Sequence, residues 1–104
     1  QALATLTAAA RARPDRPEAR FNLGRVLVGY GRPAEALPEL RAAVALRPVM
    51  APAWYYLGQA HERLEQRDEA IDAYRRTLAV DPSFERAAAA LGRLLEDVRS
   101  RDGG

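Results

Sequence analysis

The stretch Trp54-Tyr55-Tyr56-Leu57-Gly58-Gln59-Ala60-His61 has a skeleton that returns at a constant spacing of 34 residues in both directions along the chain. The positions that recur are a Leu-Gly pair, a proline and an alanine: Leu23-Gly24, Leu57-Gly58 and Leu91-Gly92; Pro14, Pro48 and Pro82; Ala2, Ala36 and Ala70. No insertion interrupts this spacing. A fixed period of this length is typical of a repeat array, in which each repeat is one supersecondary unit that packs on its neighbours.

The composition fits one small domain and excludes several classes of site. With 104 residues the chain forms one domain at most. All 16 basic residues are arginine and 14 residues are acidic, which leaves a formal charge of only +2. The absence of cysteine excludes a disulfide framework and a thiolate metal site. Nothing resembles a signal peptide or a membrane span. The start at Gln1 predicts a piece of a longer protein, and the compartment stays open.

Apolar residues recur at helical spacing between clusters of proline and glycine, and no window alternates with period two. The sequence therefore predicts an all-α fold. Short connections of two to four residues favour antiparallel helical hairpins. We expect Pro38 to distort the helix that contains it, because it removes one backbone hydrogen bond. The expected helices cover about residues 1–13, 17–30, 33–46, 51–64, 67–80 and 84–98, followed by a frayed tail over residues 99–104.

Three glycines lie inside the expected helices at equivalent places, at positions 24, 58 and 92. Glycine in a helix interior costs about 1 kcal/mol relative to alanine. Its recurrence indicates that two helices approach closely there, where a side chain would block contact. A larger residue at Gly58 should therefore destabilise the fold by about 1–3 kcal/mol through overpacking.

The sequence predicts no enzyme, no cofactor and no metal site. His61 is the only histidine, and we expect a structural, partly buried role for it. A metal would need further ligands, and Glu62 and Glu65 are more simply explained as a solvated helix face. Asp68, Glu69 and Asp72 lie near the start of a helix, where acids complement the helix dipole. The arginines are interspersed with acids rather than gathered in one stripe, so we expect neither nucleic acid nor membrane as a partner.

The pattern resembles the tetratricopeptide repeat (TPR), a family with helix–turn–helix units of this length. Within residues 51–84 the matching residues are Trp54, Leu57, Gly58, Ala70 and Pro82, with His61 and Tyr74 where tyrosine and phenylalanine are usual. Residues 17–50 keep Leu23, Gly24, Leu27, Gly31, Ala36, Leu40, Ala43 and Pro48, with Arg20 in place of the tryptophan. The resemblance divides the chain into a second helix of a partial repeat (1–16), two full repeats (17–50 and 51–84), a first helix of a further repeat or a capping helix (85–98), and a tail (99–104). It implies a right-handed superhelical array of six helices, an α-solenoid.

The resemblance also implies a concave groove lined by the first helix of each repeat, which would bind a peptide segment of a partner protein. The groove residues expected on this basis are Phe21, Asn22, Arg25, Tyr55, Tyr56, Gln59, Arg63, Arg86 and Arg93. Adjacent helical positions cannot both point into the core, so at least one of Tyr55 and Tyr56 should lie at the surface. Tyrosine and arginine favour a peptide that carries acidic groups. Asn22 matches an asparagine of the chaperone-tail readers in this family, but the lysines of their carboxylate clamp are absent.

Two alternatives to a peptide-binding scaffold remain open. The chain could be a regulatory segment of a larger multidomain protein or enzyme. It could also assemble with itself as a homo-oligomer, because the first helix lacks the partner helix of a whole repeat and leaves an apolar side exposed.

Overall fold

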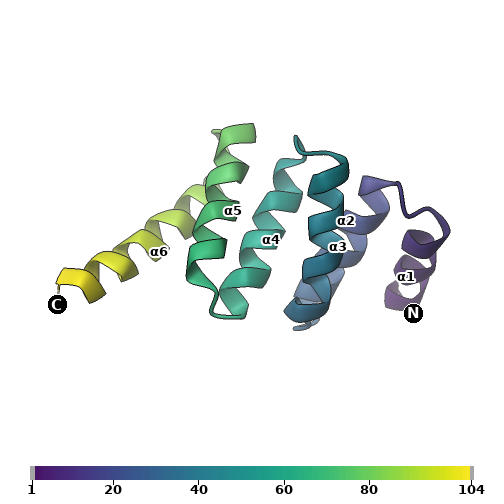
Figure 1. Cartoon of the computed structure of the whole chain (residues 1–104), viewed down its shortest axis with the longest axis horizontal. Helices are drawn as coiled ribbons and strands as arrows, with labels where there is room; N and C mark the ends of the chain where they lie inside the picture. The colour runs from purple at the N-terminus through teal and green to yellow at the C-terminus, as the bar shows by residue number, and fades with distance from the viewer. Residues whose placement is uncertain (1, 104) are drawn as a thin grey trace.

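A computed structural model describes residues 2–103, so the expectations for Gln1 and Gly104 lie outside the described residues. Over this range the chain forms six α-helices and no strand, which confirms the expected all-α class. The helices are α1 (Ala2–Ala12), α2 (Pro17–Gly29), α3 (Pro33–Leu46), α4 (Ala51–Arg63), α5 (Arg67–Val80) and α6 (Glu85–Gly103). The molecule is elongated, with extents of 50 × 25 × 18 Å. Figure 1 shows the helices in chain order along the long axis, from α1 at one end to α6 at the other.

Each helix packs mainly against its neighbours in the chain, and α2 also contacts α4 directly. This arrangement is that of an α-solenoid built from helical hairpins. It places α2 and α4 together on one face and leaves α3 and α5 as their partners. Prolines open α2, α3 and α4 in their first turns, where a missing N–H costs nothing.

Two apolar clusters form the core, and helices α4 and α5 contribute residues to both. The N-terminal cluster joins α1 to α5 and includes Leu23, Leu40 and Leu57. The C-terminal cluster joins α4 to α6 and is formed by Tyr55, Ala70, Ile71, Tyr74, Ala87, Ala90 and Leu94. Among the residues of the recurring stretch that match the repeat pattern, Leu57, Gly58 and His61 are buried, whereas Trp54 is half-buried. The two clusters therefore meet along α4, the helix that carries the recurring stretch.

The close approach predicted at the recurring glycines exists at two of the three positions. A Cβ atom at Gly24 would lie 2.5 Å from Leu40 Cγ, and one at Gly58 would lie 2.6 Å from Tyr74 Cε1. At Gly92 the same atom would meet nothing within 4 Å. The prediction is wrong for Gly92 because no described helix packs against α6 in the way that α3 packs on α2 and α5 on α4.

One further expectation about the helices is corrected. The frayed tail is wrong for residues 99–103, because α6 continues to Gly103. The hairpins turn at Gly31 and Glu65, whose φ angles are +76° and +58°, and Arg99 at the equivalent position stays helical. α3 continues through Pro38, whose ring is exposed, and the local distortion expected there stays a prediction.

Candidate functional site

A hollow of about 360 Å³ lies between α2 and α4, beside the start of α1. Two arginines, two tyrosines and one glutamine line it together with small and apolar groups: Ala2, Arg25, Val26, Val28, Gly29, Tyr30, Tyr56, Gln59 and Arg63. This α2–α4 hollow has no carboxylate among its described lining residues. Guanidinium groups beside aromatic rings and without acids favour an anionic ligand that also has an apolar part.

Contacts below the surface hold these side chains in place. The Tyr56 ring lies 5.9 Å from the Phe21 ring, and the Arg25 guanidinium lies 6.0 Å from the centre of the same Phe21 ring. Arg63 Nη1 donates a hydrogen bond of 2.7 Å to the carbonyl oxygen of Val28, near the end of α2. The same carbonyl also accepts a hydrogen bond of 3.0 Å from the Gly31 N–H, so Arg63 adds a second donor at the end of α2 and links it to α4.

A second hollow of about 280 Å³ adjoins the first, between α4 and α6. Gln59 and Arg63 line both hollows, and Glu62 and Arg93 complete the second. Arg93 Nη1 donates to Glu62 Oε2 at 2.5 Å, and the Tyr74 hydroxyl donates to Glu62 Oε1 at 2.9 Å. This α4–α6 hollow therefore holds an arginine whose charge is already paired.

The same contacts shift two ionisation equilibria. Burial raises the pKa of Glu62, but the hydrogen bonds from Arg93 and Tyr74 outweigh it, and the pKa of this carboxyl is lowered. Burial and the neighbouring Glu62 carboxylate raise the pKa of the Tyr74 hydroxyl. Glu62 is thus held as a carboxylate that fixes Arg93, and the α2–α4 hollow offers the freer positive charge.

Tyr55, which the sequence analysis expects in the groove, lines neither of these two hollows. It is only 5% exposed and lies in the C-terminal cluster, with its ring centre 5.8 Å from Tyr74 and 5.1 Å from Phe84. Its hydroxyl accepts a hydrogen bond of 2.8 Å from Gln59 Nε2. The tyrosine at the surface is Tyr56, which is half-buried. The chain reversal between α5 and α6 explains the difference, because it brings Phe84 against Tyr55.

The remaining expected residues divide between the two hollows and other surroundings. The structure brings Arg25, Tyr56, Gln59 and Arg63 together, with Phe21 beneath them and Arg93 in the adjoining hollow. Arg86 is exposed with its guanidinium 5.1 Å from the centre of the Tyr55 ring, and it lines neither hollow. The Asn22 side chain is half-buried and makes no hydrogen bond to a side chain or backbone atom within residues 2–101.

Tyr30 is a lining residue that the sequence-based expectation missed. It directly follows the last helical residue of α2, and this aromatic residue is 60% exposed to solvent. Its position beside Gly31 could have indicated its exposure, because residues at a turn lie at the surface. Val26 was missed for a different reason: it belongs to the helix face next to the predicted one.

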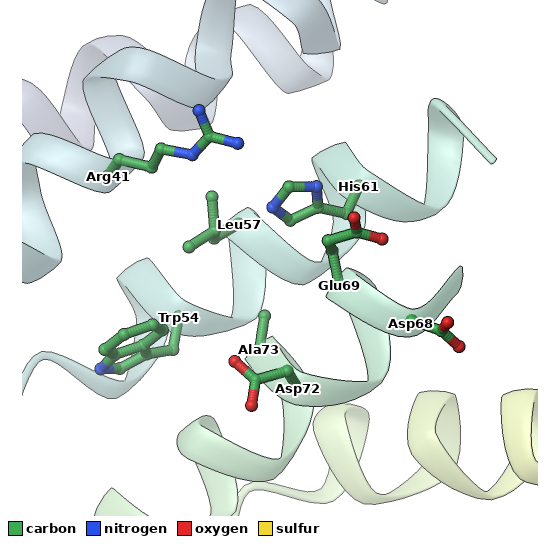
Figure 2. Close-up of a pocket in the computed structure, with 8 residues that line it drawn as sticks. All are labelled: Arg41, Trp54, Leu57, His61, Asp68, Glu69, Asp72 and Ala73. Carbon is green, nitrogen blue, oxygen red and sulfur yellow. The ribbon is translucent and has the colours of Figure 1, made fainter. Parts of the chain in front are cut away.

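A third hollow of about 400 Å³ lies on the opposite side of α4, between α3 and α5 (Figure 2). Trp54, Leu57 and His61 come from α4, and Arg41 extends over them from α3. Along α5 the lining residues are Asp68, Glu69, Asp72 and Ala73. The carboxylates give this hollow a charge opposite to that of the α2–α4 hollow.

Side chains of α4 in this third hollow have structural partners. His61 is 5% exposed and its Nδ1 lies 2.8 Å from Gln66 Oε1, in line with the expected structural role. Trp54 Nε1 donates to the carbonyl oxygen of Pro48 at 2.8 Å, and the Arg76 guanidinium lies 5.0 Å from its ring centre. These contacts explain the residues of α4 without a ligand.

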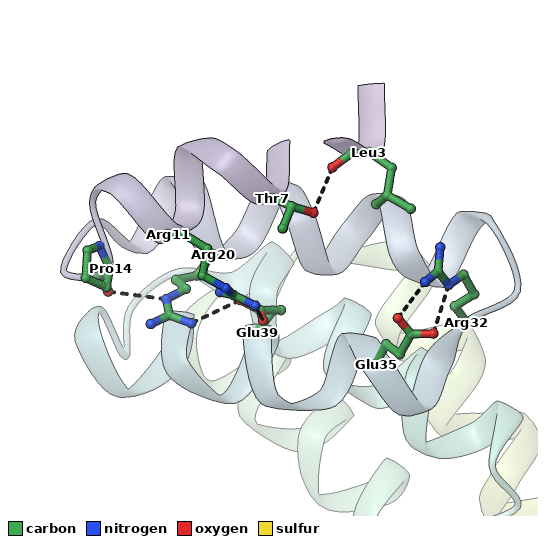
Figure 3. Close-up of polar contacts among 8 residues, drawn as sticks. All are labelled: Leu3, Thr7, Arg11, Pro14, Arg20, Arg32, Glu35 and Glu39. Carbon is green, nitrogen blue, oxygen red and sulfur yellow. Dashed lines mark hydrogen bonds and ion pairs between the residues drawn. The ribbon is translucent and has the colours of Figure 1, made fainter. Parts of the chain in front are cut away.

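Arg20, which replaces the tryptophan in the first full repeat, reproduces the contact of Trp54 (Figure 3). Arg20 Nε donates to the carbonyl oxygen of Pro14 at 3.2 Å, and Pro14 is the counterpart of Pro48. Arg20 also pairs with the buried Glu39 at 3.1 Å, and Arg11 pairs with the same carboxylate at 2.9 Å. Burial raises the pKa of Glu39, but hydrogen bonds from both arginines outweigh it and lower this pKa. The cluster ties α1, α2 and α3 together.

Neither a metal site nor a membrane-spanning helix is found over the part of the chain that the structure describes. No group of three His, Cys, Asp or Glu side chains there could hold a metal ion. No helix in that range combines the length and apolar character needed to cross a membrane.

Comparisons with known proteins identify the family of the chain. Residues 1–29 and 24–83 match the family model described as tetratricopeptide repeat. A crystal structure of MamA aligns over 97% of this chain and 59% of its own, with a TM-score of 0.90 and 28% identity. The first TPR of Spaghetti (RPAP3), bound to the HSP90 peptide SRMEEVD, aligns over 93% of this chain and 77% of its own, with a TM-score of 0.89 and 25% identity.

YrrB, a TPR protein with an unusual peptide-binding site, aligns over 86% of this chain and 46% of its own, with a TM-score of 0.81 and 29% identity. A comparison with curated proteins found no match. The chain spans less than two thirds of the length of MamA. The comparisons therefore identify the family of the chain and do not assign it the activity of a whole relative. The match to the family model covers most of the residues, and the chain belongs to the tetratricopeptide-repeat family.

Proposed function

We propose that the chain is a protein-interaction scaffold that binds an extended, acidic peptide segment of a partner protein across the α2–α4 hollow. The observation that carries this proposal is the lining of that hollow, in which Arg25 and Arg63 lie with Tyr30 and Tyr56 and without a carboxylate. Arginine pairs with carboxylates in two-pronged geometry, and tyrosine adds contact area at a low cost in side-chain entropy.

Two relatives support a peptide as the ligand. The RPAP3 repeat domain binds SRMEEVD, a segment with two glutamates and one aspartate, and YrrB has a peptide-binding site. An extended peptide also fits the geometry, since Gln59 and Arg63 connect the α2–α4 hollow with the α4–α6 hollow. The acidic side chains would contact Arg25 and Arg63, and the apolar ones would contact Tyr56.

The test compares acidic peptides with partners of identical length in which Asn and Gln replace Asp and Glu. Fluorescence anisotropy should show tighter binding of the acidic set, with affinity that falls as salt is added. Arg25→Gln should weaken this binding by about tenfold, the equivalent of one charge-assisted contact. Arg13→Gln is the matched control, because it removes the same charge from the exposed connection between α1 and α2.

Either of two outcomes would overturn the proposal. One is equal affinity for acidic and amide peptides. The other is an equal effect of the Arg25 and Arg13 substitutions, which would mean that overall charge rather than the α2–α4 hollow attracts the peptide.

A further inference from the structure

The third hollow, between α3 and α5, continues into a further hollow of about 500 Å³. Four residues line both of them: Arg41, Trp54, Leu57 and Asp72. We call the two hollows together the α3–α5 furrow. It shares no lining residue with the α2–α4 hollow, so a peptide bound there as proposed would leave the furrow accessible.

The two ends of the furrow differ in character. Toward the start of α4 the lining is mainly apolar, with Val44, Ala45, Pro48 and Trp54. Two turns further along α4, His61 lies with the carboxylates of Asp68 and Glu69 from the first turn of α5 (Figure 2). Trp54 and His61 are seven positions apart, which is about 10 Å along a helix axis. A ligand that fills the furrow therefore needs an apolar and a polar group about 10 Å apart.

The acidic end presents hydrogen-bond acceptors that no residue between 2 and 101 uses. Gln66 Oε1 only accepts, so His61 Nδ1 donates to it and the neutral ring carries a lone pair at Nε2. His61 Nε2 has no partner in that range, where every buried side-chain nitrogen and oxygen has one, so it opens onto the hollow that His61 lines. Asp68 and Glu69 are exposed and form no ion pair within the same range. These three groups together suit a donor.

The other charges of the furrow are a neutralised pair and one arginine. Asp72 accepts a hydrogen bond of 3.0 Å from Arg76 Nε, and the Arg76 guanidinium lies 5.0 Å from the centre of the Trp54 ring. Arg41 is exposed, extends over the furrow from α3 (Figure 2) and has no ion pair within residues 2–101. Two carboxylates without an ion pair thus outnumber one such guanidinium, and the end beside His61 keeps a negative charge.

We propose that the α3–α5 furrow binds a basic segment of a partner protein, whose lysine or arginine reaches Glu69 and His61 Nε2 while an apolar side chain lies on Trp54. Lysine and arginine carry only donors, which matches the acceptors at this end. Pro48 and Gln66 hold the Trp54 and His61 rings in place, and the ligand contacts the accessible parts of both rings. The chain would then hold an acidic segment on one side of α4 and a basic segment on the other.

The emission of Trp54 tests this proposal directly, because it is the only tryptophan of the chain. The probe is a peptide of glycine and serine with one leucine and one lysine three positions apart, about 10 Å in an extended chain. It should change the Trp54 emission along a saturable curve, with an affinity that falls as salt is added. A peptide with glutamine in place of the lysine should bind about fivefold more weakly.

Substitutions on the two walls should have opposite effects. Glu69→Gln should weaken binding of the lysine peptide by about threefold, and Arg41→Gln should strengthen it by about twofold because a neighbouring positive charge is removed. Glu85→Gln is the matched control, since it makes the same exchange at an exposed carboxylate in the first turn of α6, without an ion pair within residues 2–101. It should leave binding unchanged, and circular dichroism checks the fold of each variant.

Several results would overturn the proposal. A Trp54 emission that no peptide concentration changes, or equal affinity for the lysine and glutamine peptides, would exclude a basic ligand. Equal effects of the Glu69 and Glu85 substitutions would assign the binding to overall charge. Weaker binding by Arg41→Gln would give the ligand the wrong sign of charge. Arg25→Gln should leave the lysine peptide unaffected, so a failure here and a failure of the α2–α4 proposal can be told apart.

Discussion

The missing side chain at Gly58 is what allows α4 and α5 to touch. Tyr74 lies over this position and is 1% exposed, and its ring would be 2.6 Å from an added Cβ. Such a distance forces the ring to move, yet Tyr74 is held from its other end by the hydrogen bond to Glu62. The residue therefore has little freedom to give way.

Gly58→Ala should consequently lower the free energy of unfolding by about 1–3 kcal/mol, despite the better helix propensity of alanine. Urea denaturation followed by circular dichroism measures this change. Gly29→Ala is the control, because it makes the same exchange where nothing lies within 4 Å, and it should change stability by less than about 1 kcal/mol. A Gly58→Ala protein as stable as this control would mean that the hairpin does not depend on close approach.

The two tyrosines show the limit of what periodicity tells about a site. The sequence indicates that one member of Tyr55-Tyr56 must lie at the surface, and it is Tyr56. Which one turns inward depends on Phe84, a residue of the next connection that packs against Tyr55. Likewise, the pairing of Arg93 with Glu62 joins residues 31 positions apart, and no local pattern reveals it.

At the scale of the helices, prediction succeeds wherever a local signal starts or ends an element. Prolines in the first turns of α2, α3 and α4 and the left-handed Gly31 place their ends within one or two residues of the expected positions. The expected end of α6 was wrong, because the helix continues past it. The sequence of α6 has no glycine or proline at the position where the earlier hairpins turn, so no local signal ends the helix there. Glu65 shows that a non-glycine residue can make that turn, so the absence of a signal was not decisive there either.

The Glu39 cluster joins three helices, and its charge makes the joint sensitive to pH. The folded-state pKa of Glu39 is lowered, so the stabilisation it provides is present above the unfolded pKa of about 4.3 and is lost as pH falls through the folded value. Glu39→Gln should lower the free energy of unfolding by about 1–3 kcal/mol at pH 7, since two arginines lose an ionic hydrogen-bond partner.

The same variant should lose less stability than the wild-type chain between pH 7 and pH 3, because one carboxylate that senses acid is gone. Chemical denaturation at several pH values measures the difference. Glu69→Gln removes an exposed carboxylate without an ion pair among residues 2–101, and it should leave both quantities close to wild type. Parallel pH profiles for Glu39→Gln and the wild-type chain would contradict this role for the cluster.

At the scale of the whole molecule, the two apolar clusters predict uneven local stability. α3, α4 and α5 lie between neighbours on both sides, whereas α6 packs chiefly on α5. Amide hydrogen exchange should therefore be slowest in the middle helices and fastest in the last turns of α6, where few buried contacts oppose opening. Uniform protection from α2 to α6 would show instead that the chain opens only as one unit.

Tyr56 occupies an unusual place in this division, because it packs against both clusters and also lines the α2–α4 hollow. A ligand that immobilises its ring acts at the joint between the two halves of the solenoid. Binding would then reduce opening on both sides of α4, including parts of α6 that the ligand never touches. If a peptide binds as proposed, one of the residues that it contacts would thus also take part in coupling the unfolding of the two halves.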